Sequence, residues 1–265
     1  MRSAKSCFPF TGSGGKNHAF SAIGTHPPNH NAANPFTGSA NRLAAGAAFL
    51  ALILILSGCT NLQLRQFQKH AARGDHEWIA AQAIACQKAS DACGQLHLIK
   101  GDACFRLAKM DREPAVNFAC AADELQKGLA LTPAGDAVGV RLQFQEILCE
   151  SLIRLQDLQS GETAEQTLDR LMKAAKALYQ LAPESTPAVY YLSSARLMQI
   201  QPMLQNINAA TRVPVCSRLK RTVTRVLAVM ETTRRHAVPD WDRFANKYER
   251  LVFDLGTAIR TADCR

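Results

Sequence analysis

The sequence contains almost no stretch in which apolar and polar residues alternate strictly, with Val, Ile or Thr at the apolar positions. Such alternation is the pattern of a half-buried β-strand, so its absence argues against a sheet. Between the breaks made by Pro and Gly, the segments are instead rich in Ala, Leu, Gln and Arg. These residues favour helices. We therefore predict an all-α protein.

The chain also lacks an apolar run long enough to cross a bilayer. A transmembrane helix needs about 20 consecutive apolar residues, whereas the segment from Leu43 to Leu56 holds fourteen apolar or small residues. That length is typical of the h-region of a signal peptide. The segment ends in Leu56-Ser57-Gly58-Cys59. The alternative interpretation is a single N-terminal membrane anchor, for which the segment is short.

This ending resembles the lipobox of bacterial lipoproteins. In that family, cleavage before the cysteine requires small side chains, and the cysteine sulfur carries a diacylglyceryl group. The resemblance implies that residues 1–58 are a signal peptide with a long n-region, and that Cys59 carries covalent diacylglyceryl and acyl lipid. It also implies a lipid-anchored protein of the cell envelope. Thr60, in place of Asp, resembles the outer-membrane sorting pattern, so we expect the protein to face the periplasm.

Motifs of the common catalytic sites are missing as well. The sequence has no G-x-S-x-G, no H-E-x-x-H and no glycine-rich phosphate loop. Nothing therefore argues for an enzyme, and we expect neither a metal ion nor a cofactor other than the lipid. Residues 1–58 hold four of the 31 basic residues and none of the 22 acidic ones, which leaves a net charge of +5 on the remainder. This mild charge does not favour nucleic acid as a partner.

Apolar periodicity and helix-breaking residues divide the remaining chain into helices. A first helix begins at Leu62 and is closed by Gly74-Asp75. Further helices are predicted over residues 76–88, 96–109, 116–131, 138–156, 163–181, 187–206 and 214–237. A last helix begins at Asp240, a suitable N-cap residue. Pro202 is expected to kink or to end the helix in which it lies.

Parts of this pattern resemble tetratricopeptide repeats. The Gly74-Asp75 turn and the endings GLALTP and LYQLAP are similar to those of the family. Its small, apolar and proline positions correspond to Gly101, Ala121, Leu125, Gly128 and Pro133. The period is longer than the usual ~34 residues. The resemblance implies an array of antiparallel helical hairpins, an α-solenoid, over residues 59–183, which the helices of residues 184–265 would cap. An irregular helical bundle is the alternative.

Seven cysteines follow Cys59, and an exported protein lies in an oxidising space where cysteines pair. Two residues that face each other across a hairpin are about equidistant from its turn. By that criterion the spacing pairs Cys86 with Cys93, Cys104 with Cys120, and Cys216 with Cys264. Cys149 is left over, either as a small core residue or as a reactive thiol.

Two sets of side chains are candidate binding surfaces. Arg218, Arg221 and Arg225 share one helix face, where they would hold an anionic partner or form an ordinary solvated face. Tyr179, Tyr190 and Tyr191 cluster near a repeat junction, where they would line a groove for a peptide or belong to the core. We therefore expect a membrane-tethered scaffold that binds another envelope protein or peptide. The alternative is a ligand- or solute-binding accessory of a transport system; the oligomeric state is left open.

The lipobox resemblance generates a direct test. Cells that express the full chain in the presence of radiolabelled palmitate are expected to yield a labelled protein, because the acyl chains are attached through Cys59. The Cys59→Ser variant should stay unlabelled and should keep residues 1–58. An unlabelled wild-type protein with its leader uncut would contradict both the lipid anchor and the expected location.

Overall fold

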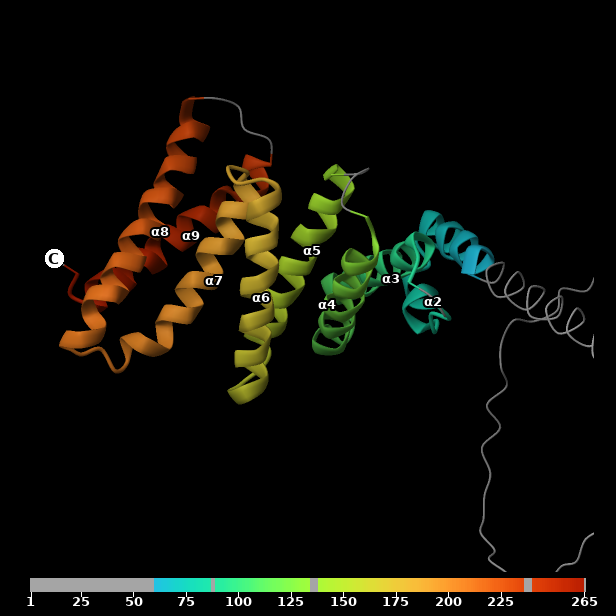
Figure 1. Cartoon of the computed structure of the whole chain (residues 1–265), viewed down its shortest axis with the longest axis horizontal. Helices are drawn as coiled ribbons and strands as arrows, with labels where there is room; N and C mark the ends of the chain where they lie inside the picture. Colours follow the sequence, from blue (N-terminus) through green and yellow to red (C-terminus); the bar gives the residue numbers. More distant parts are fainter. Residues whose placement is uncertain (1–59, 87–88, 134–137, 236–239, 265) are drawn as a thin grey trace, which may run out of the picture. The chain divides into compact units, whose positions relative to one another are not determined.

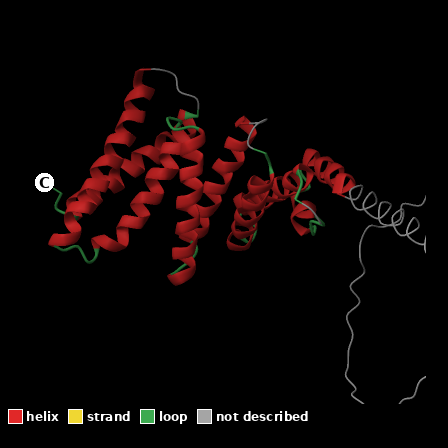
Figure 2. Ribbon diagram, in the orientation of Figure 1, coloured by secondary structure: helices red, strands yellow, loops and turns green. Residues whose placement is uncertain are grey.

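The computed structural model describes residues 60–86, 89–133, 138–235 and 240–264, and every regular element in these segments is a helix (Figures 1 and 2). The prediction of an all-α fold is thereby confirmed. Residues 63–265 form one compact unit. Cys59 and the signal region 1–58 lie outside the described residues. Within the described segments, no helix combines the length and the apolar character that crossing a bilayer requires.

The helices follow one another through short connections. A helix over residues 60–73 comes first. It is followed by α2 (His76–Ala81), α3 (Asp91–Lys109), α4 (Pro114–Leu131), α5 (Val138–Asp157), α6 (Gly161–Leu181), α7 (Thr186–Leu204), α8 (Ala209–Arg235) and α9 (Trp241–Thr261). From α3 to α7, their ends agree with the predicted ranges to within a few residues, because Pro, Gly and Ser mark most of these ends in the sequence. Pro202 lies inside α7, near its end.

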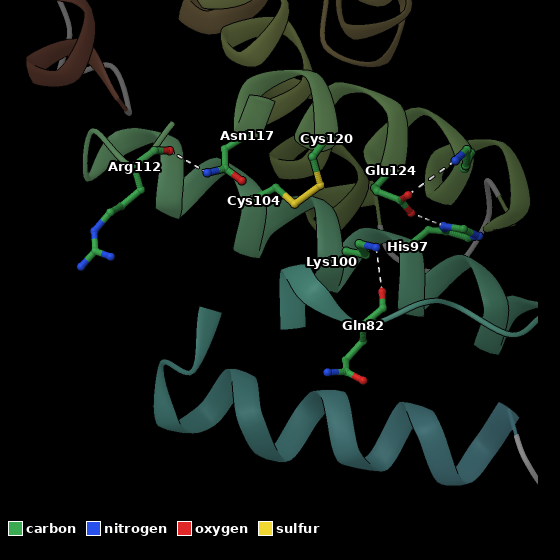
Figure 3. Close-up of a disulfide and its surroundings, with 9 residues drawn as sticks. Gln82, His97, Lys100, Cys104, Arg112, Asn117, Cys120 and Glu124 are labelled. Atoms are coloured by element: carbon green, nitrogen blue, oxygen red, sulfur yellow. Dashed lines mark hydrogen bonds and ion pairs between the residues drawn. A yellow bond between two sulfur atoms is a disulfide. The ribbon is translucent and has the colours of Figure 1, made fainter. Parts of the chain in front are cut away.

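The prediction of a helix over residues 76–88 was wrong, because α2 ends at Ala81. Gln82 is extended, with ψ at 137°. Its carbonyl oxygen accepts a hydrogen bond of 2.7 Å from Lys100 Nζ of α3, which Figure 3 shows. The carbonyl of Ala83 accepts a second one from the side chain of Gln63, also at 2.7 Å. Side chains from two other helices thus provide hydrogen bonds to the carbonyl groups of residues 82 and 83. In a longer α2, these carbonyls would accept helical hydrogen bonds instead.

The start predicted for the next-to-last helix was also wrong. Pro214 lies inside α8, and the helix begins at Ala209. The side-chain oxygen of Asn208 accepts hydrogen bonds of 3.0 Å from the backbone N–H groups of Ala210 and Thr211. Asn208 therefore caps the helix in the usual manner. Pro214 is the sixth residue of α8, beyond the first four N–H groups that lack helical partners, so it removes one backbone hydrogen bond of the helix.

Asp240 precedes α9 as predicted, but its side chain does not cap the helix. Its backbone is left-handed, with φ at 64°, and its carboxylate makes no hydrogen bond to the backbone of the first turn. The carboxylate instead accepts a hydrogen bond of 2.8 Å from the guanidinium of Arg243. The negative charge still lies at the positive end of the helix dipole, where it is favourable.

Helices α3 and α4 approach each other closely because glycines face apolar side chains across their interface. A Cβ atom built on Gly101 would lie 2.6 Å from Leu125 Cγ and 3.0 Å from the backbone nitrogen of the same leucine. One built on Gly128 would lie 2.9 Å from the backbone nitrogen of Leu98. No real side chain fits at such distances, so these two positions require glycine.

Three pairs of cysteines lie at disulfide-bonding distance, and they are the pairs that the spacing suggests. The Cα–Cα distances are 5.8 Å for Cys86–Cys93, 5.9 Å for Cys104–Cys120 and 5.3 Å for Cys216–Cys264. Figure 3 shows the second pair joining α3 to α4. The spacing argument fits Cys104–Cys120 and Cys216–Cys264, which join α3 to α4 and α8 to a residue just beyond the end of α9. Cys86 lies in the non-helical segment after α2, so its pairing with Cys93 agrees with the prediction although no helical hairpin produces it.

The largest apolar core runs through α3 to α9 and includes fully buried aromatic residues such as Tyr191, Phe244 and Tyr248. A separate cluster joins the helix over residues 60–73 to α2 and α3 through Phe67, Ile79 and Leu96. Trp78 packs against the edge of Phe67 in this cluster. Residues near the beginning of the described chain are therefore tied to the rest by their own apolar contacts.

The close approach of α3 and α4 predicts the outcome of a paired substitution. Gly101→Ala is expected to lower the free energy of unfolding by about 1–3 kcal/mol through overpacking, although alanine ordinarily favours a helix. Gly256→Ala is the control, since the nearest atom to the added carbon lies 3.7 Å away; it should be neutral or should stabilise α9 by up to about 1 kcal/mol. Urea denaturation of both variants measures the difference. Equal effects would refute the tight interface.

Candidate functional site

A cavity of about 960 Å³ lies among α3, α5, the start of α7 and the start of α9. We call it the α5 groove. Its apolar lining consists of Phe105, Met110, Leu142, Ile147, Leu178 and Pro187. Charged residues from α3, α9 and the α6–α7 connection also contribute to the lining, so the groove combines an apolar surface with charged groups.

Helical periodicity explains why these residues share one surface. Asp102, Phe105, Arg106 and Lys109 line the groove from α3, with spacings of three, four and seven residues. The α5 residues Gly139, Leu142, Gln143, Glu146 and Ile147 repeat the same spacing. Residues so spaced lie on one face of a helix. Each of these two helices therefore presents one continuous face to the groove.

A carboxylate of α5 is neutralised at the edge of the groove by α9. Glu146 forms an ion pair with the Arg243 guanidinium, which also binds Asp240 at 2.8 Å. Burial raises the pKa of the Glu146 carboxyl, and the nearby Arg243 opposes this effect. The pair links α5 to α9 across the groove.

One helical turn further along α5, Glu150 is the centre of a second, more deeply buried network. Its carboxylate accepts a hydrogen bond of 2.9 Å from Tyr191 and forms ion pairs with Lys247 at 2.8 Å and Arg154 at 3.1 Å. Burial alone would raise the pKa of Glu150, but these partners, Lys247 first, lower it below its ordinary value. The ammonium of Lys247 also lies 4.8 Å from the centre of the Phe244 ring, a cation–π contact.

The predicted tyrosine surface does not line the α5 groove. Tyr191 is only 1% exposed, and its hydroxyl is committed to Glu150, as the core alternative expects. Tyr190 is half-buried and packs edge-on against Phe244, at 5.4 Å between ring centres. Tyr179 is half-buried beneath the guanidinium of Arg225. Of the three tyrosines, only Tyr191 is fully buried in the core. The faces of α3 and α5 that line the groove were not predicted from the sequence.

The three arginines that were predicted to form a binding surface lie together in the folded structure. Arg218, Arg221 and Arg225 project from α8 into one cavity of about 470 Å³. Two further basic residues, Lys176 of α6 and Arg196 of α7, line the same cavity. The spacing on α8 identifies the first three residues, but the contributions of α6 and α7 depend on tertiary structure. We call this cavity the basic cavity.

The cysteines among the described residues offer no open metal site or reactive thiol. Ligand atoms of Cys86, Cys93 and His97 lie within 4.8 Å of one another, yet the two sulfurs form a disulfide and so provide no thiolate. His97 is itself hydrogen-bonded to Glu124 at 2.5 Å. Cys149 is free and buried. Burial raises the pKa of its thiol well above the ordinary value, which disfavours the nucleophilic thiolate.

Comparison of the chain with models of protein families, with curated proteins and with solved structures yields no match.

The Glu150 network predicts a pH-dependent loss of stability. Lys247→Met should leave the Glu150 carboxylate without its strongest partner and lower the free energy of unfolding by about 2 kcal/mol at about pH 7. In the wild type the folded pKa of Glu150 is lowered, so its contribution is present above the unfolded pKa and is lost as the pH falls through the folded pKa. In the variant that pKa is expected to rise.

The deficit of Lys247→Met should therefore shrink as the pH falls from the raised pKa of the variant toward the lowered folded pKa of the wild type, and it should be smallest at about pH 3. Urea denaturation at both pH values measures it. Glu150→Gln combined with Lys247→Met is the matched control, because a neutral amide no longer needs the ammonium; the double variant should recover most of the loss. A deficit that is independent of pH would point to lost packing instead.

Proposed function

We propose that this protein is a helical-repeat scaffold that binds a peptide segment of another cell-envelope protein in the α5 groove. It would be tethered by lipid on Cys59, with the groove facing the periplasm at the outer membrane. The observation that carries the proposal is the groove itself, with its six apolar lining residues and its charged edge. Specific recognition of peptides commonly combines apolar pockets with a few placed polar groups.

The contacts between helices support a repeat array. Each helix from α2 to α9 packs against the next one in the chain, and α3, α5, α7 and α9 also pack in succession. Residues that meet across α3 and α4 run in opposite order, since Gly101 faces Leu125 and Gly94 faces Thr132. This is the pattern of antiparallel helical hairpins that contact only their neighbours. In this arrangement α8 and α9 would cap the array and cover its apolar end.

The chemistry of the groove favours a particular occupant. Asp102, Glu146 and Asp240 are paired with arginines of the same lining, so they need no ligand. Lys109 and Glu184 are exposed and make no ion pair within the described segments. We propose a segment with two or three apolar side chains, flanked by one acidic and one basic residue that complement these two groups. A cavity of about 960 Å³ exceeds what a single side chain needs and is near the upper end of ordinary ligand sites.

The alternative function, a ligand-binding accessory of a transport system, is favoured by a different feature. The basic cavity on α6, α7 and α8 gathers five cations around a space of about 470 Å³, which is within the size range of small-molecule sites. The two functions are compatible, because the groove and the cavity share no lining residue.

Site-specific photo-cross-linking tests the groove. A photoreactive amino acid at Met110, which is exposed and lines the groove, is expected to give a discrete cross-linked product in intact cells. The same amino acid at Phe253, an equally exposed apolar residue of α9 outside the groove, is the control. Adding Gln143→Arg should place a bulky cation in the groove and should reduce the product by about tenfold, as expected for a loss of about 1.4 kcal/mol.

Mass spectrometry should map the cross-link to a segment with apolar side chains flanked by opposite charges. Three outcomes would contradict the proposal: no product from Met110, equal products from Met110 and Phe253, or a product that Gln143→Arg does not change.

A further inference from the structure

The basic cavity is lined by charged residues of one sign from three helices. Lys176 comes from α6, Arg196 from α7, and Arg218, Arg221 and Arg225 from α8. The remaining lining residues are Met172, Gln199, Ile200 and Thr222. None of them is acidic, so five positive charges surround about 470 Å³ of space.

Within the described segments, no carboxylate lies within ion-pair distance of any of the five cations. Elsewhere in the protein, cations near carboxylates are paired, as Lys247 and Arg243 are. Burial lowers the pKa of Arg196, and the neighbouring Arg225 and Arg221 lower it further. The cations thus repel one another at close range, and an anion in the cavity would relieve that repulsion.

Arg225 provides an independent observation. Its guanidinium lies 5.1 Å from the centre of the Tyr179 ring, which fixes its position. Its Nη1 atom is buried and has no hydrogen-bond partner among the described residues. A buried charged donor without an acceptor is energetically unfavourable. An ordinary solvated face of a helix does not contain such a group, whereas a site that awaits an anionic ligand does.

The arrangement of the donors indicates the class of anion. Guanidinium groups bind phosphate and sulfate oxygens through two parallel hydrogen bonds. Four guanidinium groups and one ammonium exceed what a single such group neutralises. The cavity volume also lies in the range of about 300–1,000 Å³ that small-molecule sites occupy. We propose that the basic cavity binds a compound that carries two or more phosphate or sulfate groups, either free in solution or as the headgroup of a lipid.

Thermal unfolding and calorimetry with defined probes test this site. The full chain is used with Cys59→Ser in every arm, so that no lipid on this cysteine can carry the protein to a membrane. Pyrophosphate and inositol hexakisphosphate are the soluble probes, with inorganic phosphate and chloride at equal ionic strength for comparison. Both soluble probes are expected to raise the unfolding temperature, inositol hexakisphosphate more strongly, and chloride should not. Affinity should fall as salt increases.

Single substitutions locate the binding. Arg225→Gln is expected to weaken inositol hexakisphosphate binding by about 10- to 100-fold, the loss of one or two charge-assisted hydrogen bonds. Arg218 is exposed, so Arg218→Gln should leave the fold intact. This variant should weaken inositol hexakisphosphate binding by about tenfold, and it keeps the test valid if Arg225→Gln unfolds the protein. Arg73→Gln removes the same charge from an exposed position outside the cavity and should leave the affinity within about twofold.

A flotation assay distinguishes the two sources. Binding to phosphatidylcholine vesicles that contain phosphatidylinositol 4,5-bisphosphate, lost in Arg218→Gln and retained in Arg73→Gln, would assign a lipid headgroup. Binding of the soluble probes alone would assign a free compound. The proposal is overturned if no probe shifts the unfolding temperature, or if Arg73→Gln weakens binding as much as Arg218→Gln does. These measurements do not involve the α5 groove, so their outcome is independent of the peptide-binding function.

Discussion

The carboxylate of Glu150 is the point at which helices distant in the chain are held together. It belongs to α5 and binds the hydroxyl of Tyr191 from α7 and the ammonium of Lys247 from α9. A buried carboxylate without such partners would be costly, so α5, α7 and α9 are required to keep this arrangement. Helix α9 packs against α7 and α8, so only its long side chains reach α5. Lys247 and Arg243 do so, one turn apart, and the edge of the α5 groove follows from their reach.

This arrangement separates two kinds of charge in the molecule. The acidic residues of α5 are neutralised by cations of α9, so the edge of the groove is electrically balanced and its apolar lining can determine what binds. The five cations that line the basic cavity have no such partners in the described segments. A protein that pairs its buried carboxylates so fully has no structural need to leave five cations facing one cavity. The imbalance is therefore better explained by a ligand than by folding.

The success of sequence-based prediction depended on whether a feature was set by local or by tertiary geometry. The bounds of α5 and α6 were predictable because breakers mark both ends, and the cysteine pairing across helical hairpins was predictable because equal distance from a turn is a local property. The end of α2 could not be predicted from the sequence, because it depends on hydrogen bonds from the side chains of Gln63 and Lys100 to the backbone that follows α2. The tyrosines could not be assigned, since only the folded structure shows that Tyr191 faces Glu150. Of the basic cavity, the sequence revealed the three arginines spaced along α8, whereas Lys176 and Arg196 are brought there by packing.

The positions of the disulfides complement the Glu150 network. In an array whose elements contact only their neighbours, the ends lose their contacts first. Two bridges lie near the beginning, within α2 to α4, and the third joins α8 to the residue that follows α9. The closed loops differ in length, and the chain-entropy model gives about 2–4 kcal/mol for each of them. The middle of the unit, α5 to α7, has no bridge among its described residues and depends on apolar packing and on Glu150. Covalent links thus constrain α3, which lines the groove, and α8, which lines the basic cavity. The remaining side chains of both linings that come from α5 to α7 are held by non-covalent contacts alone.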